Sequence, residues 1–154
     1  ALPITNMTLP LLLLLLVAST QTLDVTVFNK CSEKIQVVFD GGLHIDSEGN
    51  STAVAPNASY RRTVSSNSGT ITSTGLPGNT TGGLTTAIFF NFFGPTFGIQ
   101  IFKGYDYAMK VAPSSGRAIA CSNSTCFGNI WGMNIPMETA DGPPDGKYNV
   151  TFCT

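Results

Sequence analysis

The stretch Leu23-Asp24-Val25-Thr26-Val27-Phe28-Asn29 decides the fold of this chain. Apolar and polar side chains alternate along its first five positions, so an extended backbone places the apolar side chains on one face and the polar ones on the other. Valine, threonine and phenylalanine are also among the residues that favour strands. The stretch therefore predicts a β-strand with one face in a core and the other in water.

Eight further short segments are similarly rich in β-branched and aromatic residues, and clusters of glycine, proline, asparagine and serine separate them. They are Lys34 to Phe39, Tyr60 to Val64, Thr70 to Thr74, Thr86 to Phe93, Phe97 to Phe102, Tyr107 to Val111, Arg117 to Cys121 and Tyr148 to Cys153. Nine short strands with turn signals between them predict an all-β sandwich or barrel. The Ser-, Thr- and Gly-rich stretch from Ser65 to Thr86 is expected to form an exposed hairpin or loop.

The composition limits the class of protein. Of the 154 residues, 42% are hydrophobic and only 11% are charged, and the formal net charge is -1. This balance fits neither a disordered chain nor a nucleic-acid binder, which needs a basic surface. The length suits one domain. We expect that domain over residues 23–154, preceded by a distinct segment over residues 1–22.

Six Asn-x-Ser/Thr triplets occur in the chain, with the acceptors Asn6, Asn50, Asn57, Asn79, Asn123 and Asn149. None has proline in the middle, so each fits the N-glycosylation pattern. Six in so short a chain favour the eukaryotic secretory pathway and an extracellular, sugar-coated protein. The four cysteines agree, because an even number is typical of disulfides in an oxidising compartment and their spacing fits no zinc template. N-linked glycans are expected, and no cofactor or metal.

Residues 1–22 differ from the rest because Leu9 to Ala18 is almost wholly apolar. This apolar arm contains Leu9, Leu11, Leu12, Leu13, Leu14, Leu15, Leu16 and Val17. It is too short to span a membrane. It fits a signal peptide, removed as residues 7–19, or an arm that stays in the protein and is buried in a groove of the same or a neighbouring subunit. The start at Ala1 favours the retained arm, and a strand and a helix both remain open for it.

Five of the ten phenylalanines lie between Ile88 and Phe97, four of them as Phe89, Phe90, Phe92 and Phe93. They can form an exposed surface for carbohydrate or a neighbouring subunit, or a central strand buried on both faces. The buried strand is the favoured interpretation, and the apolar arm is a candidate to cover its second face. A second apolar patch surrounds Trp131 and extends to Met137. It is either a loop on the core or a rim for a partner.

The only cluster of titratable residues runs from Asp40 to Asn50. Asp46, Glu48 and Asn50 alternate as calcium ligands do, but the remaining spacing of a calcium loop is missing. A hairpin turn with solvated charges is therefore favoured. His44 has no nucleophile near it in the sequence, so no catalytic triad can be argued. The basic doublet Arg61-Arg62 lies on an expected strand, and its partners are acidic groups or none.

Three segments resemble those of one known family. They are Val25-Thr26-Val27-Phe28-Asn29-Lys30-Cys31, then Gly104-Tyr105-Asp106-Tyr107-Ala108-Met109-Lys110-Val111-Ala112-Pro113 followed by Cys121 and Cys126, and Tyr148-Asn149-Val150-Thr151-Phe152-Cys153-Thr154. In this order they resemble the thaumatin-like (osmotin, pathogenesis-related 5) family. The resemblance implies a flattened β-sandwich and a disulfide from Cys31 to Cys153. Because the chain lacks the family's cysteine-rich second domain, Cys121 and Cys126 are expected to pair with each other.

The resemblance does not extend to the family's acidic cleft. One of the cleft aspartates would stand before Gly104, where this chain has Lys103. A glycosidase needs two carboxyl groups facing each other across the sugar. The available candidates are Asp40, Asp46, Glu48, Asp106, Glu138 and Asp141. No facing pair can be identified among them, so a protein that is not an enzyme is expected.

These observations lead to two hypotheses for the function. The first is a structural extracellular glycoprotein that polymerises into a filament or surface layer, each subunit inserting its apolar arm into the next. The alternative is a secreted monomeric thaumatin-like protein that binds carbohydrate or inhibits a hydrolase in defence, with residues 7–19 removed. The expected partners are other copies of the chain in the first case and carbohydrate or a hydrolase in the second, without nucleic acid or a membrane span.

Overall fold

A computed structural model describes residues 22–65, 68–74, 85–90, 96–102, 107–123, 125–127 and 137–154. The apolar arm, Phe92, Phe93, Asp106 and Trp131 lie outside these ranges, as do Asn6 and Asn79. Within the described ranges the chain forms eleven β-strands. None of these residues forms a helix that could cross a membrane.

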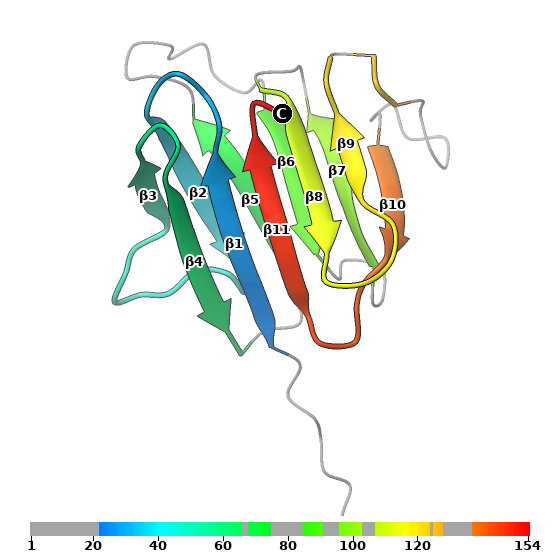
Figure 1. Ribbon diagram of the computed structural model, residues 1–154. Coiled ribbons are helices and arrows are strands. Elements are labelled where there is room, and N and C mark those ends of the chain that lie inside the picture. The colour runs from blue at the N-terminus through cyan, green and yellow to red at the C-terminus, as the bar shows by residue number, and fades with distance from the viewer. Residues whose placement is uncertain are drawn as a thin grey trace, which may run out of the picture.

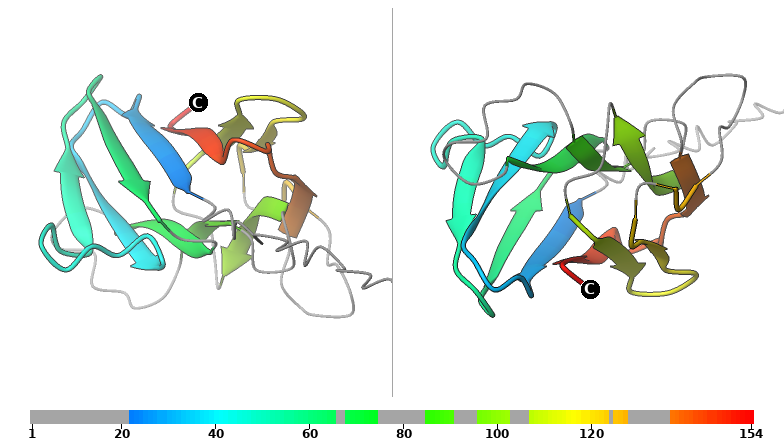
Figure 2. Two further views of the ribbon diagram at one scale, coloured as in Figure 1. Left: turned by 90° about the horizontal axis from the view of Figure 1, so that it is seen from below. Right: turned by 90° about the horizontal axis from the view of Figure 1, so that it is seen from above.

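The strands form two sheets that stack face to face (Figures 1 and 2). Their bounds are β1 (Leu23–Asn29), β2 (Ile35–Gly41), β3 (Ser51–Val54), β4 (Ser59–Val64), β5 (Gly69–Thr74), β6 (Thr85–Phe90), β7 (Thr96–Phe102), β8 (Met109–Pro113), β9 (Ile119–Cys121), β10 (Met137–Asp141) and β11 (Lys147–Phe152). Sheet A has the order β4-β1-β11-β8-β9, and sheet B has the order β10-β7-β6-β5-β2-β3. The all-β sandwich expected from the sequence is confirmed.

The first and last described strands lie side by side in the middle of sheet A. β1 and β11 run parallel, with Val27 opposite Val150, whereas every other described strand pair is antiparallel. A disulfide joins Cys31 to Cys153 just beyond these strands, and a second joins Cys121 to Cys126. Both are the pairings that the family resemblance implied. In the chain-entropy account the long loop closed by the first is worth about 4 to 5 kcal/mol.

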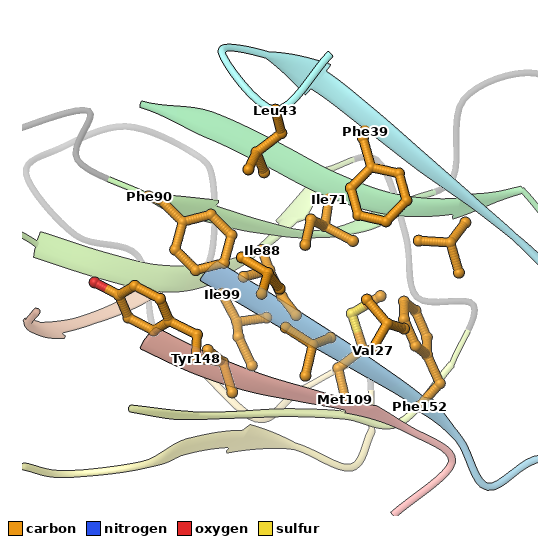
Figure 3. Packing of buried hydrophobic residues seen from close by; sticks show 14 of the residues in the cluster. Val27, Phe39, Leu43, Ile71, Ile88, Phe90, Ile99, Met109, Tyr148 and Phe152 are labelled. Carbon is orange, nitrogen blue, oxygen red and sulfur yellow. The ribbon is translucent and has the colours of Figure 1, made fainter. Parts of the chain in front are cut away.

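The core lies between the sheets. Alternate residues of β1 are buried and half-buried, as the opening stretch predicts, and the buried ones face sheet B. Tyr148 of β11 packs edge-on against Phe90 and Phe97 of sheet B, with ring centroids 4.7 and 5.3 Å apart (Figure 3). Such contacts add to the hydrophobic burial that holds the two layers together.

The aromatic strand β6 is buried on both faces. Phe90 points into the core with 0% exposure, and Phe89 on the outer face is only 2% exposed. Their assignment to an exposed partner surface is therefore wrong, because β6 lies in the interior of sheet B between β5 and β7. The interpretation as a central strand, favoured on the sequence, is the correct one.

Two strands were missed in the sequence and one segment was misplaced. β3 and β10 are short edge strands with few β-branched residues. Met137 begins β10, but in the sequence it was grouped with the apolar patch around Trp131 and not with a strand. β5 lies inside sheet B, paired with β2 and β6, and its Ile71 is fully buried. The strand expected at Thr70 to Thr74 is thus confirmed, and an exposed hairpin or loop is wrong for this part of the stretch from Ser65 to Thr86. Residues 66–67 and 75–84 of that stretch lie outside the described residues.

Candidate functional site

The outer face of sheet A, turned toward the viewer in Figure 1, carries a hollow of about 320 Å³. We call it the sheet A hollow. Its lining comes from β4, β1, β11 and the end of β8, and consists of Asp24, Thr26, Arg61, Ser114, Lys147, Tyr148 and Asn149. The lining residues of β1 and β4 follow the alternation of those strands, because every second side chain faces outward.

One wall of the sheet A hollow is an ion pair across β1 and β4. Arg61 donates to both carboxylate oxygens of Asp24, from Nε at 2.7 Å and from Nη2 at 2.5 Å. The Thr63 hydroxyl donates to the same carboxylate at 3.1 Å. The hydrogen bonds from Arg61 hold the pKa of Asp24 below its usual range, and the pairing raises the pKa of Arg61. Asp24 is therefore a fixed anion and not a proton donor.

Asp145, in the turn before β11, does not line the hollow but bonds two residues that do, Ser114 and Lys147. Its carboxylate accepts from the Ser114 hydroxyl at 2.6 Å and from the backbone N–H of Lys147 at 3.2 Å. The bond from Ser114 lowers the pKa of Asp145. The turn closes with a bond from the Gly146 N–H to the Pro143 carbonyl, and Gly146 takes a φ of 64°. This backbone conformation favours glycine.

The chemistry of the sheet A hollow suits a neutral polar ligand. Hydroxyl, amide and paired charged groups donate and accept hydrogen bonds as sugar hydroxyls require. A glycosidase acid, in contrast, needs a carboxyl whose pKa is raised so that it holds a proton near neutral pH. The carboxyl groups of Asp24 and Asp145 both have lowered pKa values. Neither carboxyl is therefore held in the protonated form that a glycosidase acid requires.

A second feature is the connection between β2 and β3, residues 42–50, which extends at the lower left of Figure 1. The fully buried guanidinium of Arg62 holds it from beneath, lying 4.1 Å from the centroid of the Phe39 ring. It donates to the carbonyls of Leu43 at 2.9 Å and Gly49 at 3.2 Å. We call residues 42–50 the braced loop, because a buried cation that bonds its backbone restrains it from both ends.

The braced loop presents charged side chains to water. Asp46, 99% exposed, lies 2.9 Å from Nε2 of His44, which is 41% exposed. Glu48 is half-exposed, accepts from the Tyr60 hydroxyl at 2.8 Å and lies 3.5 Å from Arg62. Leu43 instead points into the core (Figure 3). A turn with solvated charges, favoured on the sequence, describes these residues better than a calcium loop, and the described residues contain no group of three or more metal-ligating side chains.

The carboxylates considered for catalysis are dispersed. Asp40 lies near the end of β2 and Asp141 ends β10, and these strands lie toward opposite edges of sheet B. Glu138 of β10 is ion-paired with Arg117. Asp46 and Glu48 belong to the braced loop, where they lie beside His44 and Arg62.

Of the doublet Arg61-Arg62, one cation lines the sheet A hollow and the other lies beneath the braced loop. Successive residues of β4 point to opposite faces, so Arg61 lies on the outer face at Asp24 while Arg62 lies inside at Phe39. The sequence did not reveal the lining of the sheet A hollow. The alternation in β1 signals that Asp24 faces outward, but the strand register that brings Arg61 and Lys147 beside it has no local signal.

Four of the expected glycan acceptors lie in the described residues, and all four are exposed: Asn50, Asn57, Asn123 and Asn149. Asn57 sits at the tip of the turn between β3 and β4 with a φ of 59°. Asn123 lies in the loop closed by the second disulfide, where its side-chain oxygen accepts from the Thr125 hydroxyl at 2.9 Å. Asn149 is on β11, and it lines the sheet A hollow.

Comparison with solved structures shows which known fold the chain has. No protein-family model and no curated protein sequence matches the chain. Among solved structures, it is similar to the protein elicitor MoHrip2 from Magnaporthe oryzae, with a TM-score of 0.56 and 14% identity over 86% of this chain and 99% of that one. It is also similar to the thaumatin-like xylanase inhibitor TLXI, with a TM-score of 0.53 and 17% identity over 84% of this chain and 99% of that one. The chain therefore has the thaumatin-like fold.

Proposed function

We propose that the protein is a secreted, non-enzymatic recognition protein that inhibits an extracellular polysaccharide hydrolase. The observation that carries the proposal is the fold, which the chain shares over most of its length with a xylanase inhibitor and an elicitor. The two disulfides agree with a protein made for an oxidising, extracellular compartment.

The braced loop is the proposed contact with the hydrolase. An inhibitor gains affinity when its contact loop is already held in the bound shape, because less conformational entropy is lost on binding. Arg62 supplies that restraint through Leu43 and Gly49. The exposed acidic groups Asp46 and Glu48 project from the same loop and can attract a basic patch near the enzyme's cleft.

Inhibition assays test this proposal. The secreted protein is titrated against hydrolases of xylan, β-glucan and chitin, with the initial rate as the readout. The charge reversal Asp46→Lys should weaken inhibition by about tenfold or more, as for a central charge in an interface. Asp141→Lys, at another exposed carboxylate on β10, is the matched control and should leave inhibition unchanged. The proposal fails if no hydrolase is inhibited, or if both variants inhibit as well as the unaltered protein.

The sheet A hollow supports carbohydrate binding as a second candidate function. Its lining combines the hydroxyl of Thr26 and the amide of Asn149 with the charged group of Lys147. Titration with soluble oligosaccharides of the same polysaccharides is the test. Lys147→Ala should weaken binding, whereas Lys110→Ala, on the same face but outside the lining, should not.

Polymerisation through the apolar arm remains a proposal of lower rank. The arm lies outside the described residues, and the similar structures are named as an elicitor and an inhibitor. The particle size of the native protein in solution distinguishes a polymer from the monomeric inhibitor.

A further inference from the structure

The acceptor Asn149 differs in position from the other described acceptors. It lies in the middle of β11, which is the central strand of sheet A, whereas Asn57 is at a turn tip and Asn123 is in a loop. Its side chain is exposed on the outer face, and Thr151, the third residue of the triplet, is two positions along the same face. The sheet therefore presents the acceptor and the threonine of the triplet on its outer face, while Val150 between them points into the core.

The neighbours of Asn149 leave space beside it. In the register of sheet A, Asn149 is opposite Thr26 of β1 and Ala112 of β8. Both side chains are small, so they project little from the sheet beside the acceptor. The sheet A hollow opens at this position. A hollow of about 320 Å³ is at the lower end of small-molecule sites. It can take one or two sugar rings.

We propose that Asn149 carries an N-linked glycan whose first sugars lie in the sheet A hollow. The hydroxyl and acetamido groups of the first sugar find polar partners around the hollow in the Asp24–Arg61 pair, Ser114 and Lys147. Because the sugar is tethered to Asn149, its effective concentration at the hollow reaches the millimolar range that short flexible links give. A free sugar would have to compete with it.

This inference requires the secretory route of the proposed function but not the inhibition of a hydrolase. It concerns the same hollow as the second candidate function, and it restricts that candidate to molecules in which Asn149 is unmodified. The two are separable, since one is a covalent modification read by mass and the other is a binding equilibrium.

Native-state deglycosylation tests the proposal. The protein is secreted from a eukaryotic host, its occupied sites are mapped by glycopeptide mass spectrometry, and the folded protein is treated with a peptide N-glycosidase. We expect the glycan on Asn149 to be released about tenfold more slowly than that on Asn57, which corresponds to about 1.4 kcal/mol of contact. After denaturation both should be released at the same rate.

Two variants test whether slow release at Asn149 comes from contact between the glycan and the hollow or only from the position of Asn149 on a strand. Lys147→Ala removes one lining group and should speed the release at Asn149. Lys110→Ala is the control, because Lys110 is exposed on the same face, opposite Thr151, and does not line the hollow. The proposal is overturned if Asn149 is unmodified while Asn57 is occupied, if the two native release rates are equal, or if Lys147→Ala and Lys110→Ala act alike.

A final comparison uses Thr151→Ala, which removes the triplet and retains Asn149. If oligosaccharide binds this variant but not the glycosylated protein, the chain's own glycan excludes an outside sugar. If oligosaccharide binds neither, the second candidate function fails, and the protection measured at Asn149 still stands. Equal binding to both forms would show that the glycan lies elsewhere and would overturn the inference.

Discussion

The ring of Phe89 in β6 covers Gly98, the residue opposite it in β7, and occupies the space that a Cβ atom at position 98 would take. An aromatic side chain laid over a glycine of the neighbouring strand shields that part of the backbone from water. The contact contributes to the burial of Phe89, which is 2% exposed although it points away from the core. The glycine is required here for close approach and not for an unusual backbone angle.

Gly98→Ala should therefore destabilise the fold. The added methyl group would overlap the Phe89 ring and the backbone carbonyl of Glu138, and overpacking of this kind costs about 1 to 3 kcal/mol. Urea unfolding gives the free energy. Combining the change with Phe89→Leu should recover part of the loss, because the two residues are in contact. Strictly additive effects of the two changes would contradict the described contact.

Asn29 should be the most sensitive polar residue of the first strand. Its buried side chain donates to the carbonyls of Glu33 at 2.8 Å and Val54 at 2.9 Å and accepts from the Cys31 N–H at 2.9 Å. Asn29→Ala leaves these groups unpaired and should cost about 2 to 3 kcal/mol. Asn29→Asp retains only the acceptor and should also destabilise. Thermal unfolding measures both, with Ser122→Ala, at an exposed polar residue, as a control close to zero.

The Asp24–Arg61 pair should make stability depend on acidic pH. The folded pKa of Asp24 is below the unfolded value near 3.8, so its contribution is present above pH 3.8 and disappears as pH falls through the folded pKa. Because Arg61 is 65% exposed, water screens the pair and Asp24→Asn should cost only about 0.5 to 1 kcal/mol at pH 7. The difference between the variant and the unaltered protein should shrink as the pH falls below 3.8 and through the folded pKa of Asp24. An equal difference at pH 7 and pH 2 would argue against the pairing.

Tyr148 should make stability depend on alkaline pH. Burial, with a smaller contribution from the charge of Asp145, raises its pKa from 10.0 to about 12. The unfolded chain then loses the phenol proton first, so the contribution of Tyr148 is complete below pH 10 and is lost between pH 10 and about 12. The slope is at most about 1.4 kcal/mol per pH unit. Tyr148→Phe should flatten it, and a slope unchanged by that substitution would contradict the assignment.

Deleting Leu9 to Ala18 separates the polymer from the monomeric inhibitor. If the arm links subunits, the native protein is a large particle and the deletion yields soluble monomers, because the arm supplies the apolar joint. Light scattering combined with N-terminal sequencing of the native protein measures both properties. A monomer whose chain starts near Thr20 would instead show that the arm is removed, and the polymer would be excluded.

The sequence allows the strands to be predicted where one face is buried and the other is wet. β1 and β11 alternate along their length, and their expected bounds are within one residue of the structure. β3 and β10 escape detection because a short edge strand needs only a few residues with strand preference. The described part of β6 ends at Phe90, and Asn91 to Phe93 of the expected strand lie outside the described residues.

The sites were less predictable than the strands, because they depend on register. The sheet A hollow is made by residues as distant in sequence as Asp24 and Lys147, which the parallel pairing of β1 with β11 places opposite each other. No local pattern marks such a pairing. For Arg62, the strand pattern predicts only that it faces away from Arg61, and its aromatic and carbonyl partners come from a separate strand and loop.

Because β11 lies between β1 and β8, sheet A can be completed only after β11 has been synthesised. Cys153 is made 122 residues after Cys31, on the order of ten seconds later at ribosomal speed. β2, β3, β5, β6 and β7 of sheet B emerge well before that and can pair with one another, while β1 waits beside β4 without its parallel neighbour. In a secreted chain, Asn149 passes the translocation site while β11 is still unpaired. If Asn149 carries the proposed glycan, the sugar is added before the strand is inserted, and β11 carries it into the closing sheet.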